Sequence, residues 1–192
     1  ESTREEIMRA TYYALCEYGY AALTIQRIGE EFPKSPSLIY HHYDGKDELL
    51  LDFLGFMLER FESTVPFEDA DGEDEHLDAI LDHMFVSSLP EERRQFSEAM
   101  VELRAQAAHD EGYRDHFTRH DRFFVDRIAA IVASGIEDGV FCDVDPEAVA
   151  TMLVTTINGS LVQRVTSEEN TAPTIRRQVD AYLRSVVLEG AE

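Results

Sequence analysis

The chain has 192 residues, of which 44% are hydrophobic, so it is long enough and apolar enough to bury a substantial core. Its 39 acidic residues oppose 17 basic ones, and the resulting net charge of −22 would repel DNA and anionic membranes at ordinary ionic strength. No run approaches the roughly 20 apolar residues of a membrane span, and the first residues lack the pattern of a secretory signal, so we expect a cytoplasmic protein with no membrane partner.

The hydrophobic pattern predicts helices throughout the chain and no β-strand. Gly19 stands where a C-terminal helix cap belongs, Thr24 can cap the second helix, and Pro33 ends it. Ser35 followed by Pro36 is typical of the start of a third helix. In chain order, the expected helices cover residues 4–18, 24–32, 35–43, 47–63, 74–88, 91–108, 111–138, 146–166 and 173–188.

The stretch VPFEDADGEDEH, residues 65–76, is the most loop-like part of the chain. Its acidic residues invite a calcium-loop interpretation, but no register supplies both the glycine and the final glutamate that an EF-hand loop requires. We therefore interpret it as a solvated acidic linker between two parts of the protein.

The second and third expected helices, with the turn between them, form a candidate helix-turn-helix motif. The second helix of such a motif can enter a DNA major groove, which is about 12 Å wide. Leu38, Ile39 and Tyr43 supply an apolar side that would dock this helix on its own domain. Ser37, His41 and His42 would present hydrogen-bonding groups on the other side.

The negative charge is unevenly distributed. Residues 1–46 hold seven acids and five bases, a net charge of −2, which leaves −20 for the remaining residues. The only two lysines of the chain, Lys34 and Lys46, bracket the second helix of the candidate motif. An acid-rich, lysine-poor composition is similar to that of proteins from salt-accumulating halophiles, and an ordinary acidic protein is the alternative. The segment that is spared acidity is the one expected to meet DNA.

The run GYAALTIQRIGEEFPKSPSLIYHHYDGKDELL resembles the TetR family of transcriptional repressors, and its turn resembles that of halophilic archaeal members. Two positions depart from the family pattern. Gly29 replaces a small alanine, and Pro33 replaces the turn glycine, so the turn must follow a different backbone path. The matching positions are Gly19, Thr24, Ile25, Ile28, Ser35, Ile39, Tyr40, Tyr43, Lys46 and Leu49.

The resemblance implies which residues contact DNA. Thr24, Tyr40 and Lys46 are expected at phosphates, which accept hydrogen bonds from hydroxyl and ammonium groups. Gln26 can bond an adenine edge, and Leu38 can touch a thymine methyl group. The expected DNA-binding residues are Thr24, Gln26, Arg27, Lys34, Ser35, Pro36, Ser37, Leu38, Tyr40, His41, His42 and Lys46.

The resemblance also implies an all-α architecture and a homodimer. A helix-turn-helix DNA-binding domain is expected over residues 1–46, a connecting helix over 47–65, and a helical effector-binding and dimerisation domain over 66–192. In the family the last two long helices pair with those of a second copy, and Gly159 and Ser160 would permit close approach. A two-fold dimer places its reading helices about 34 to 36 Å apart, so the expected operator is palindromic.

Aromatic and methionine positions on the middle helices predict a small apolar effector, such as an acyl chain or a hydrophobic drug, that releases the repressor from DNA. Ordinary core packing is the alternative for each of them. The expected effector-binding residues are Met84, Phe85, Phe96, Met100, Leu103, Phe117, Phe123 and Phe124.

His116 and His120 lie four residues apart with Asp121 beside them, a spacing that can ligate a metal ion on one helix face. Arg119 and Arg122 flank them and would oppose a cation. We therefore expect neither a metal site nor a cofactor.

No nucleophile with a base, phosphate-binding glycine loop or dense cluster of ligands is visible, so we expect no enzyme. Cys16 and Cys142 lie far apart in the sequence, which favours buried or unreactive thiols over a disulfide framework. The alternative function is a helical protein–protein adaptor that has lost DNA binding, an interpretation favoured by Pro33 and by the negative charge.

Overall fold

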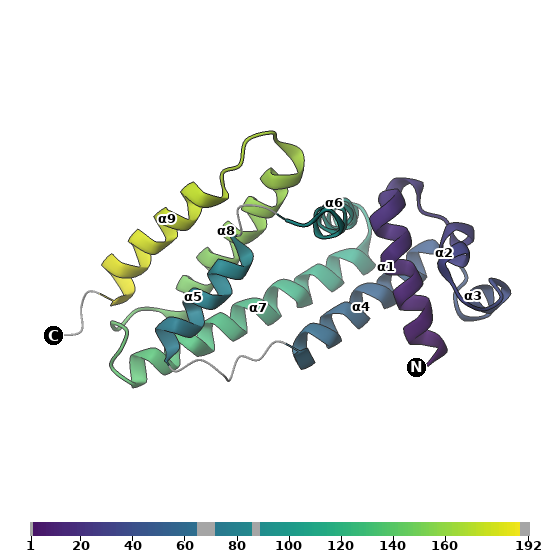
Figure 1. The fold of residues 1–192 in the computed structure, drawn as a ribbon. Helices are drawn as coiled ribbons and strands as arrows, with labels where there is room; N and C mark the ends of the chain where they lie inside the picture. The colour runs from purple at the N-terminus through teal and green to yellow at the C-terminus, as the bar shows by residue number, and fades with distance from the viewer. Residues whose placement is uncertain (1, 65–71, 86–88, 189–192) are drawn as a thin grey trace. The chain divides into compact units, whose positions relative to one another are not determined.

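The computed structural model describes residues 2–64, 72–85 and 89–188, and every regular element among them is helical, as the hydrophobic pattern predicted (Figure 1). The chain divides into two compact units, one within residues 1–65 and 89–118 and the other within 66–88 and 119–192. The first unit contains α1 (Thr3–Ala22), α2 (Ile25–Glu31), α3 (Ser37–His42), α4 (Lys46–Thr64), α6 (Glu91–Gln106) and the first turns of α7 (Glu111–Glu137). The second contains α5 (Glu73–Met84), the rest of α7, α8 (Pro146–Thr166), α9 (Ala172–Tyr182) and a π-helical segment, Leu183–Leu188.

The predicted helix cap at Thr24 is confirmed, and Asp145 caps α8 in the same way. The Thr24 side chain accepts a hydrogen bond from the backbone N–H of Arg27 at 3.2 Å, and Asp145 accepts from the N–H groups of Glu147 and Ala148 at 3.0 and 3.2 Å. Each bond satisfies a backbone donor that has no partner inside the helix.

Several helix boundaries differ from the prediction. The third helix begins at Ser37, because Pro36 is its N-cap and the Ser35 hydroxyl bonds the Ser37 hydroxyl at 2.8 Å instead of a backbone N–H. The fifth helix ends at Met84, where the prediction ran through residues 86–88, which lie outside the described part. The last helix widens into π-helical geometry at Leu183.

A break in α1 stands at Gly19, where the sequence predicted a cap. Gly19 has a φ of 65°, a left-handed conformation that side chains disfavour, and the helix resumes for three residues to Ala22. The N–H of Tyr20 is freed by the break and donates to the carboxylate of Glu102 on α6 at 2.6 Å. A carboxylate of α6 thus fixes the end of α1.

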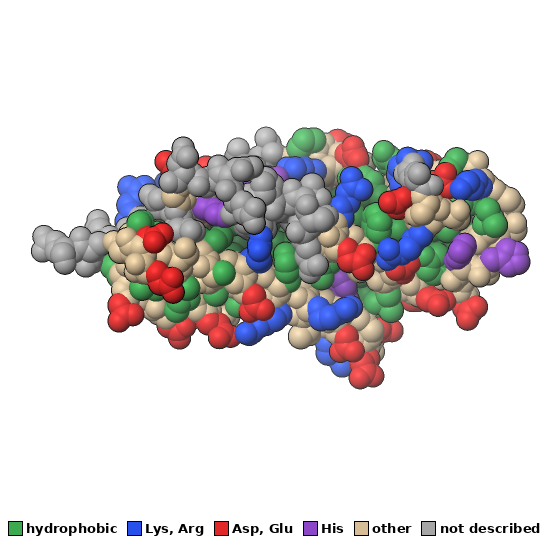
Figure 2. Space-filling model, turned by 90° about the horizontal axis from the view of Figure 1, so that it is seen from below, with side chains coloured by type: hydrophobic (Ala, Val, Ile, Leu, Met, Phe, Trp, Pro, Cys, Tyr) green, Lys and Arg blue, Asp and Glu red, His purple; other side chains and the backbone are tan. Residues whose placement is uncertain are grey.

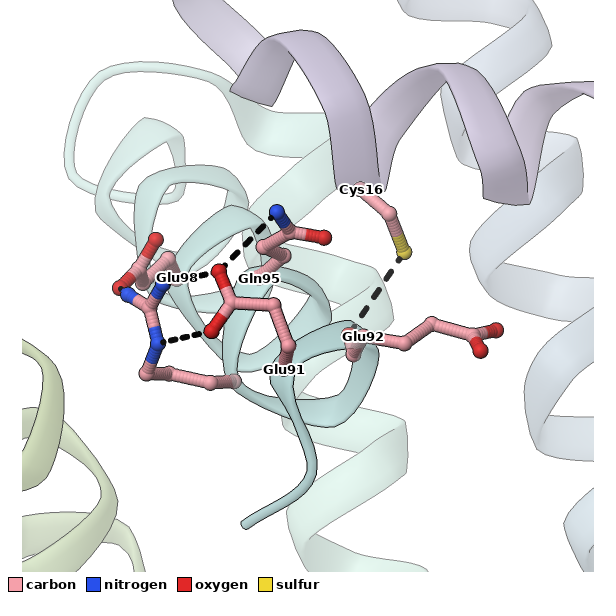
Figure 3. A network of polar contacts seen from close by, with 6 residues as sticks. Cys16, Glu91, Glu92, Gln95 and Glu98 are labelled. Atoms are coloured by element: carbon pink, nitrogen blue, oxygen red, sulfur yellow. Dashed lines mark hydrogen bonds and ion pairs between the residues drawn. The ribbon is translucent and has the colours of Figure 1, made fainter.

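The core of the first unit is built mainly from α1, α4 and α6. Its fully buried side chains include Ile7, Leu15, Ile28, Ile39, Phe53 and Leu103. Figure 3 shows where α6 begins against α1: the Cys16 sulfur lies 3.9 Å from the carbonyl oxygen of Glu92. Burial raises the pKa of the Cys16 thiol, which suits a packing role rather than a reactive one.

The core of the second unit joins α5, α7, α8 and α9. Its buried members include Leu81, Ile128, Val132, Leu153, Val179 and Val187. At the surface of this unit, the guanidinium of Arg176 forms ion pairs with Asp78 and Asp82, both at 2.9 Å, and with Asp180. One cation therefore fastens α9 to α5 through the two carboxylates of α5, while Asp180 pairs with it within α9.

None of the described helices combines the length and apolar content needed to cross a bilayer. On the face of the molecule drawn in Figure 2, acidic and basic side chains are interspersed.

Candidate nucleic-acid interface

Helix α3 has one side in the core and one side in solvent, as its sequence predicted. Ile39 is fully buried and Tyr43 is 8% exposed, so they anchor the helix and its C-terminal end. Leu38 is partly buried at the edge of this side. The opposite side is open: the Tyr40 side chain is 60% exposed, and Ser37, His41 and His42 are exposed with it. A rigidly docked helix thus presents hydroxyl and imidazole groups outward.

The turn before α3 follows a path without left-handed residues. Among the described residues, positive φ occurs only at Gly19 and Gly139, so the turn through Pro33 keeps φ negative throughout. The proline that replaces the family glycine is therefore compatible with the chain path.

A close approach of α2 and the start of α3 explains why Gly29 stands in place of the family's alanine. A Cβ atom at Gly29 would lie 2.8 Å from the Cβ and 3.1 Å from the Cγ of Pro36, which is closer than van der Waals contact allows. The Pro36 ring is rigid and cannot turn aside. Glycine at position 29 is what lets Pro36 pack there.

A carboxylate at Asp52 ties the end of α3 to two other helices. It accepts a hydrogen bond from the Tyr43 hydroxyl at 2.5 Å and two from the Arg4 guanidinium, at 2.6 and 3.1 Å. The bond from Arg4 lowers the pKa of Asp52, and burial raises the pKa of Tyr43. Arg4 and Asp52 were not predicted from the sequence, because no local spacing connects residues 48 positions apart in the chain.

The three expected cationic contacts lie against their own chain. The Lys46 ammonium donates to the carbonyl oxygen of Tyr20 at 3.1 Å and stands 4.1 Å from the centre of its ring. Lys34 forms an ion pair with Glu6 and donates to the Thr3 hydroxyl at 3.3 Å. These contacts hold the ammonium groups in place and reduce the positive field they project.

Arg27 behaves like the two lysines. Its guanidinium donates to the carbonyl oxygen of Ala22 and lies over the ring of Tyr18, 4.4 Å from the ring centre. The remaining expected contacts, Thr24, Gln26, Ser35 and Pro36, have exposed side chains. DNA contact by each of the twelve residues stays a prediction.

A second shared carboxylate, Asp47, joins α4 to α1 and to the first turns of α7. One oxygen of Asp47 accepts hydrogen bonds from the hydroxyls of Tyr113, at 2.9 Å, and Tyr20, at 3.1 Å. Tyr113 is 1% exposed, and burial raises the pKa of its hydroxyl. Because Tyr20 also holds Lys46, this node fixes an expected phosphate contact relative to α7.

The eight expected effector residues fall into two different hydrophobic clusters. Four of them, Phe96, Met100, Leu103 and Phe117, belong to the cluster of the first unit. Met84, Phe85 and Phe124 belong to that of the second, and Phe123 stacks edge-on to Phe124 at a centroid distance of 5.1 Å. The structure does not gather them within one unit, and their effector role stays a prediction.

The expected absence of a metal site concerned α7. In the described ranges, no group of three or more histidine, cysteine or acidic side chains is placed to hold a metal ion. The Nδ1 of His120 instead lies 3.2 Å from the Oδ1 of Asp121, and His116 is buried beside Phe117.

The two parts of the chain match two family profiles. Residues 7–53 match the profile described as bacterial regulatory proteins of the tetR family, and residues 73–188 match the C-terminal profile of BetI-type transcriptional repressors. Together they include α2, α3 and α8, and the second alone covers more than half of the chain.

Individual proteins are similar over nearly the whole length. The repressor AcnR of Corynebacterium diphtheriae is 24% identical over 183 residues, which are 95% of this chain and 90% of that protein. The crystal structure of a TetR transcription regulator from Haloarcula marismortui is 37% identical, with a TM-score of 0.86, and the match covers 96% of this chain and 98% of that one. A complex of SmeT with triclosan is 24% identical, with a TM-score of 0.75, over 100% of this chain and 95% of that one.

Proposed function

The chain belongs to the TetR family of transcriptional repressors, and on this basis we propose that it binds a palindromic operator as a homodimer and releases it when a small apolar effector binds. It is a regulator and not an enzyme. We assign DNA binding to residues 1–46, the connecting helix to 47–65, and effector binding and dimerisation to 66–192, in the cytoplasm where the operator lies.

The observation that carries the DNA-binding part is the two-sided character of α3. Ile39 and Tyr43 hold the helix to its unit, and the side that faces solvent carries Ser37, Tyr40 and two histidines. Hydroxyl and imidazole groups donate and accept hydrogen bonds, so they suit base edges and phosphates alike.

Replacing Tyr40 with phenylalanine tests this part. A hydrogen bond to a charged partner contributes about 1.5 to 3 kcal/mol, so the variant is expected to bind the operator about tenfold more weakly or worse. The loss should be similar for all operator sequences, because a phosphate contact does not read bases. Fluorescence anisotropy with DNA from upstream of the protein's own gene provides the measurement.

The matched control is Tyr13→Phe, which removes a hydroxyl from a side chain on α1 that is 48% exposed. It should leave operator affinity and thermal stability unchanged. If the wild-type chain binds no upstream DNA at any salt concentration, the repressor interpretation fails and the adaptor interpretation takes its place.

The exposed side of α8 supports dimerisation. Thr151, Thr155, Gly159 and Val162 recur at helical spacing along it and are all exposed, with 39% of the Val162 side chain open to solvent. Small residues let two helix backbones approach closely, and an apolar residue gains free energy when a partner covers it. A second copy of the chain would supply that cover.

An apolar effector is proposed from the composition of the second unit. Met84 and Phe124 are only partly buried beside its core, so their side chains retain surface that a ligand can cover. The related regulator SmeT has been solved in complex with triclosan. For this chain, we propose that a movement of α7 displaces α4 and Lys46 through the hydrogen bond from the Tyr113 hydroxyl to Asp47.

We further propose a weak or inverted dependence of operator affinity on salt, as suits a halophilic protein. At about 1 M salt the Debye length is about 3 Å, so long-range attraction from two lysines is negligible. Direct hydrogen bonds, apolar contacts and cations held between carboxylates and phosphates would then dominate.

Operator affinity is measured by fluorescence anisotropy across a series of potassium chloride concentrations that extends beyond about 1 M. With conventional counterion release, the logarithm of the affinity falls linearly with the logarithm of the salt concentration, with a slope of about −0.9 per neutralised phosphate. A steep fall of this kind would contradict the proposal while leaving operator binding itself intact.

A further inference from the structure

A pair of polar side chains on the buried side of α8 lacks the partners that such groups normally have. The Ser160 side chain is 4% exposed, and its hydroxyl oxygen makes no hydrogen bond within the described part of the protein. One helical turn later, the Nε of Arg164 is likewise buried without a partner. A buried hydrogen-bonding group left unpaired costs about 1 to 3 kcal/mol, so two on one helix face call for an explanation.

The charge of Arg164 is uncompensated as well. Its Nη2 donates to the carbonyl oxygen of Met84, at the end of α5, at 3.1 Å. No carboxylate of the described residues lies within ion-pair distance of it, whereas Arg4, Arg94, Arg122 and Arg176 each pair with one or more. Burial lowers the pKa of Arg164, as expected for a cation without a counter-ion.

The lack of an acidic partner for Arg164 among the described residues is unexpected in so acidic a chain. Its 39 acidic residues outnumber the basic ones by more than two to one, yet none of the described acids neutralises this partly buried guanidinium. Side chains four residues apart on a helix have Cβ atoms about 5 to 6 Å apart, so a single planar anion can reach both groups. A carboxylate fits, since one oxygen can accept from the Ser160 hydroxyl and the other from Nε of Arg164.

We propose that Ser160 and Arg164 bind the carboxylate of the effector, whose apolar body lies against the partly buried side chains of the second unit. The inference rests on the proposed effector response and gives the effector class: an apolar acid rather than a neutral apolar molecule or an organic cation. Met84 and Ile157 are among the partly buried neighbours of the core on α5 and α8. The bound carboxylate supplies the counter-charge that the described residues do not provide.

The test uses the full chain and measures binding without DNA, by calorimetry and thermal shift at one fixed potassium chloride concentration. The probes are benzoate and octanoate, the matched alcohols benzyl alcohol and octanol, and the cation octyltrimethylammonium. At least one carboxylate is expected to bind saturably and about tenfold or more tightly than its matched alcohol, with no binding of the cation. Equal binding of acid and alcohol, preference for the cation, or no saturable carboxylate binding overturns the proposal.

Two variants and a control locate the site. Ser160→Ala removes an unpartnered buried hydroxyl, so it should not lower the melting temperature, yet it should weaken carboxylate binding about tenfold. Arg164→Met should abolish the preference for acid over alcohol. Arg119→Met removes an exposed guanidinium from the same unit and should change neither carboxylate affinity nor the preference for acid over alcohol. Unchanged carboxylate binding in both Ser160 and Arg164 variants places the anion elsewhere and overturns the assignment.

Operator anisotropy on the same preparations distinguishes a failure of the proposed anion site from a failure of the proposed repressor function. Operator binding without carboxylate binding overturns only the effector class. Carboxylate binding that depends on Ser160 and Arg164, in a chain that binds no operator, supports the anion site and overturns the proposed repressor function.

Discussion

Gly159→Arg is expected to leave each chain folded, abolish the proposed dimer and weaken operator binding by at least about a hundredfold. A Cβ added at Gly159 meets no atom within 4 Å, so the fold of one chain has room for a side chain there. A long cationic side chain on the exposed side of α8 would separate two closely approaching helices. Linking two binding modules raises affinity by about 10² to 10⁴, and a monomer would lose that gain.

Analytical ultracentrifugation gives the oligomeric state of the variant, and anisotropy gives its operator affinity. The control is Gly55→Arg, which adds the same charge inside α4, also at a position where a Cβ meets nothing within 4 Å. That variant should remain a dimer. A Gly159→Arg protein that dimerises and binds DNA like the wild type would show that α8 does not form the interface.

Gly29→Ala is expected to displace α3 and weaken operator binding by tenfold or more. Alanine normally stabilises a helix interior by about 1 kcal/mol relative to glycine. Here the added Cβ would lie 2.8 Å from the Cβ of Pro36, and overpacking of this kind typically costs about 1 to 3 kcal/mol. Relief of the contact would move the start of α3 and with it the side that faces DNA.

A double-mutant cycle with Pro36→Gly isolates this contact. Thermal or denaturant unfolding of the double variant should show a smaller loss than the sum of the two single losses, because the Cβ and Cγ atoms that the added methyl group would strike have been removed. Gly55→Ala is the control, and it should be neutral or stabilising. Additive effects of the two substitutions in unit one would contradict the proposed clash.

The sequence predicted the helices well because their signals are local. Apolar spacing predicted every helix, and the caps at Thr24 and Asp145 depend on residues within three positions of each other. The boundary error at Ser37 arose where proline geometry decides the start of the helix. Periodicity reports which residues can share a face, and it carries little information about the last turn.

The candidate site was predictable in part for the same reason. The polar side of α3 follows from its own six residues, whereas the Asp52 and Asp47 nodes join helices that are distant in the chain. In the sequence, Ser160 is a small residue suited to helix packing, and no local pattern distinguishes Arg164. Whether such side chains have hydrogen-bond partners depends on residues that are distant in the chain.

The contact between Gly29 and Pro36 also makes the effect of a substitution at one position depend on the residue at the other. With Pro36 in place, a methyl group at position 29 would meet its Cβ at 2.8 Å, whereas glycine at 29 costs only helix propensity. We therefore expect positions 29 and 36 to tolerate change together rather than singly.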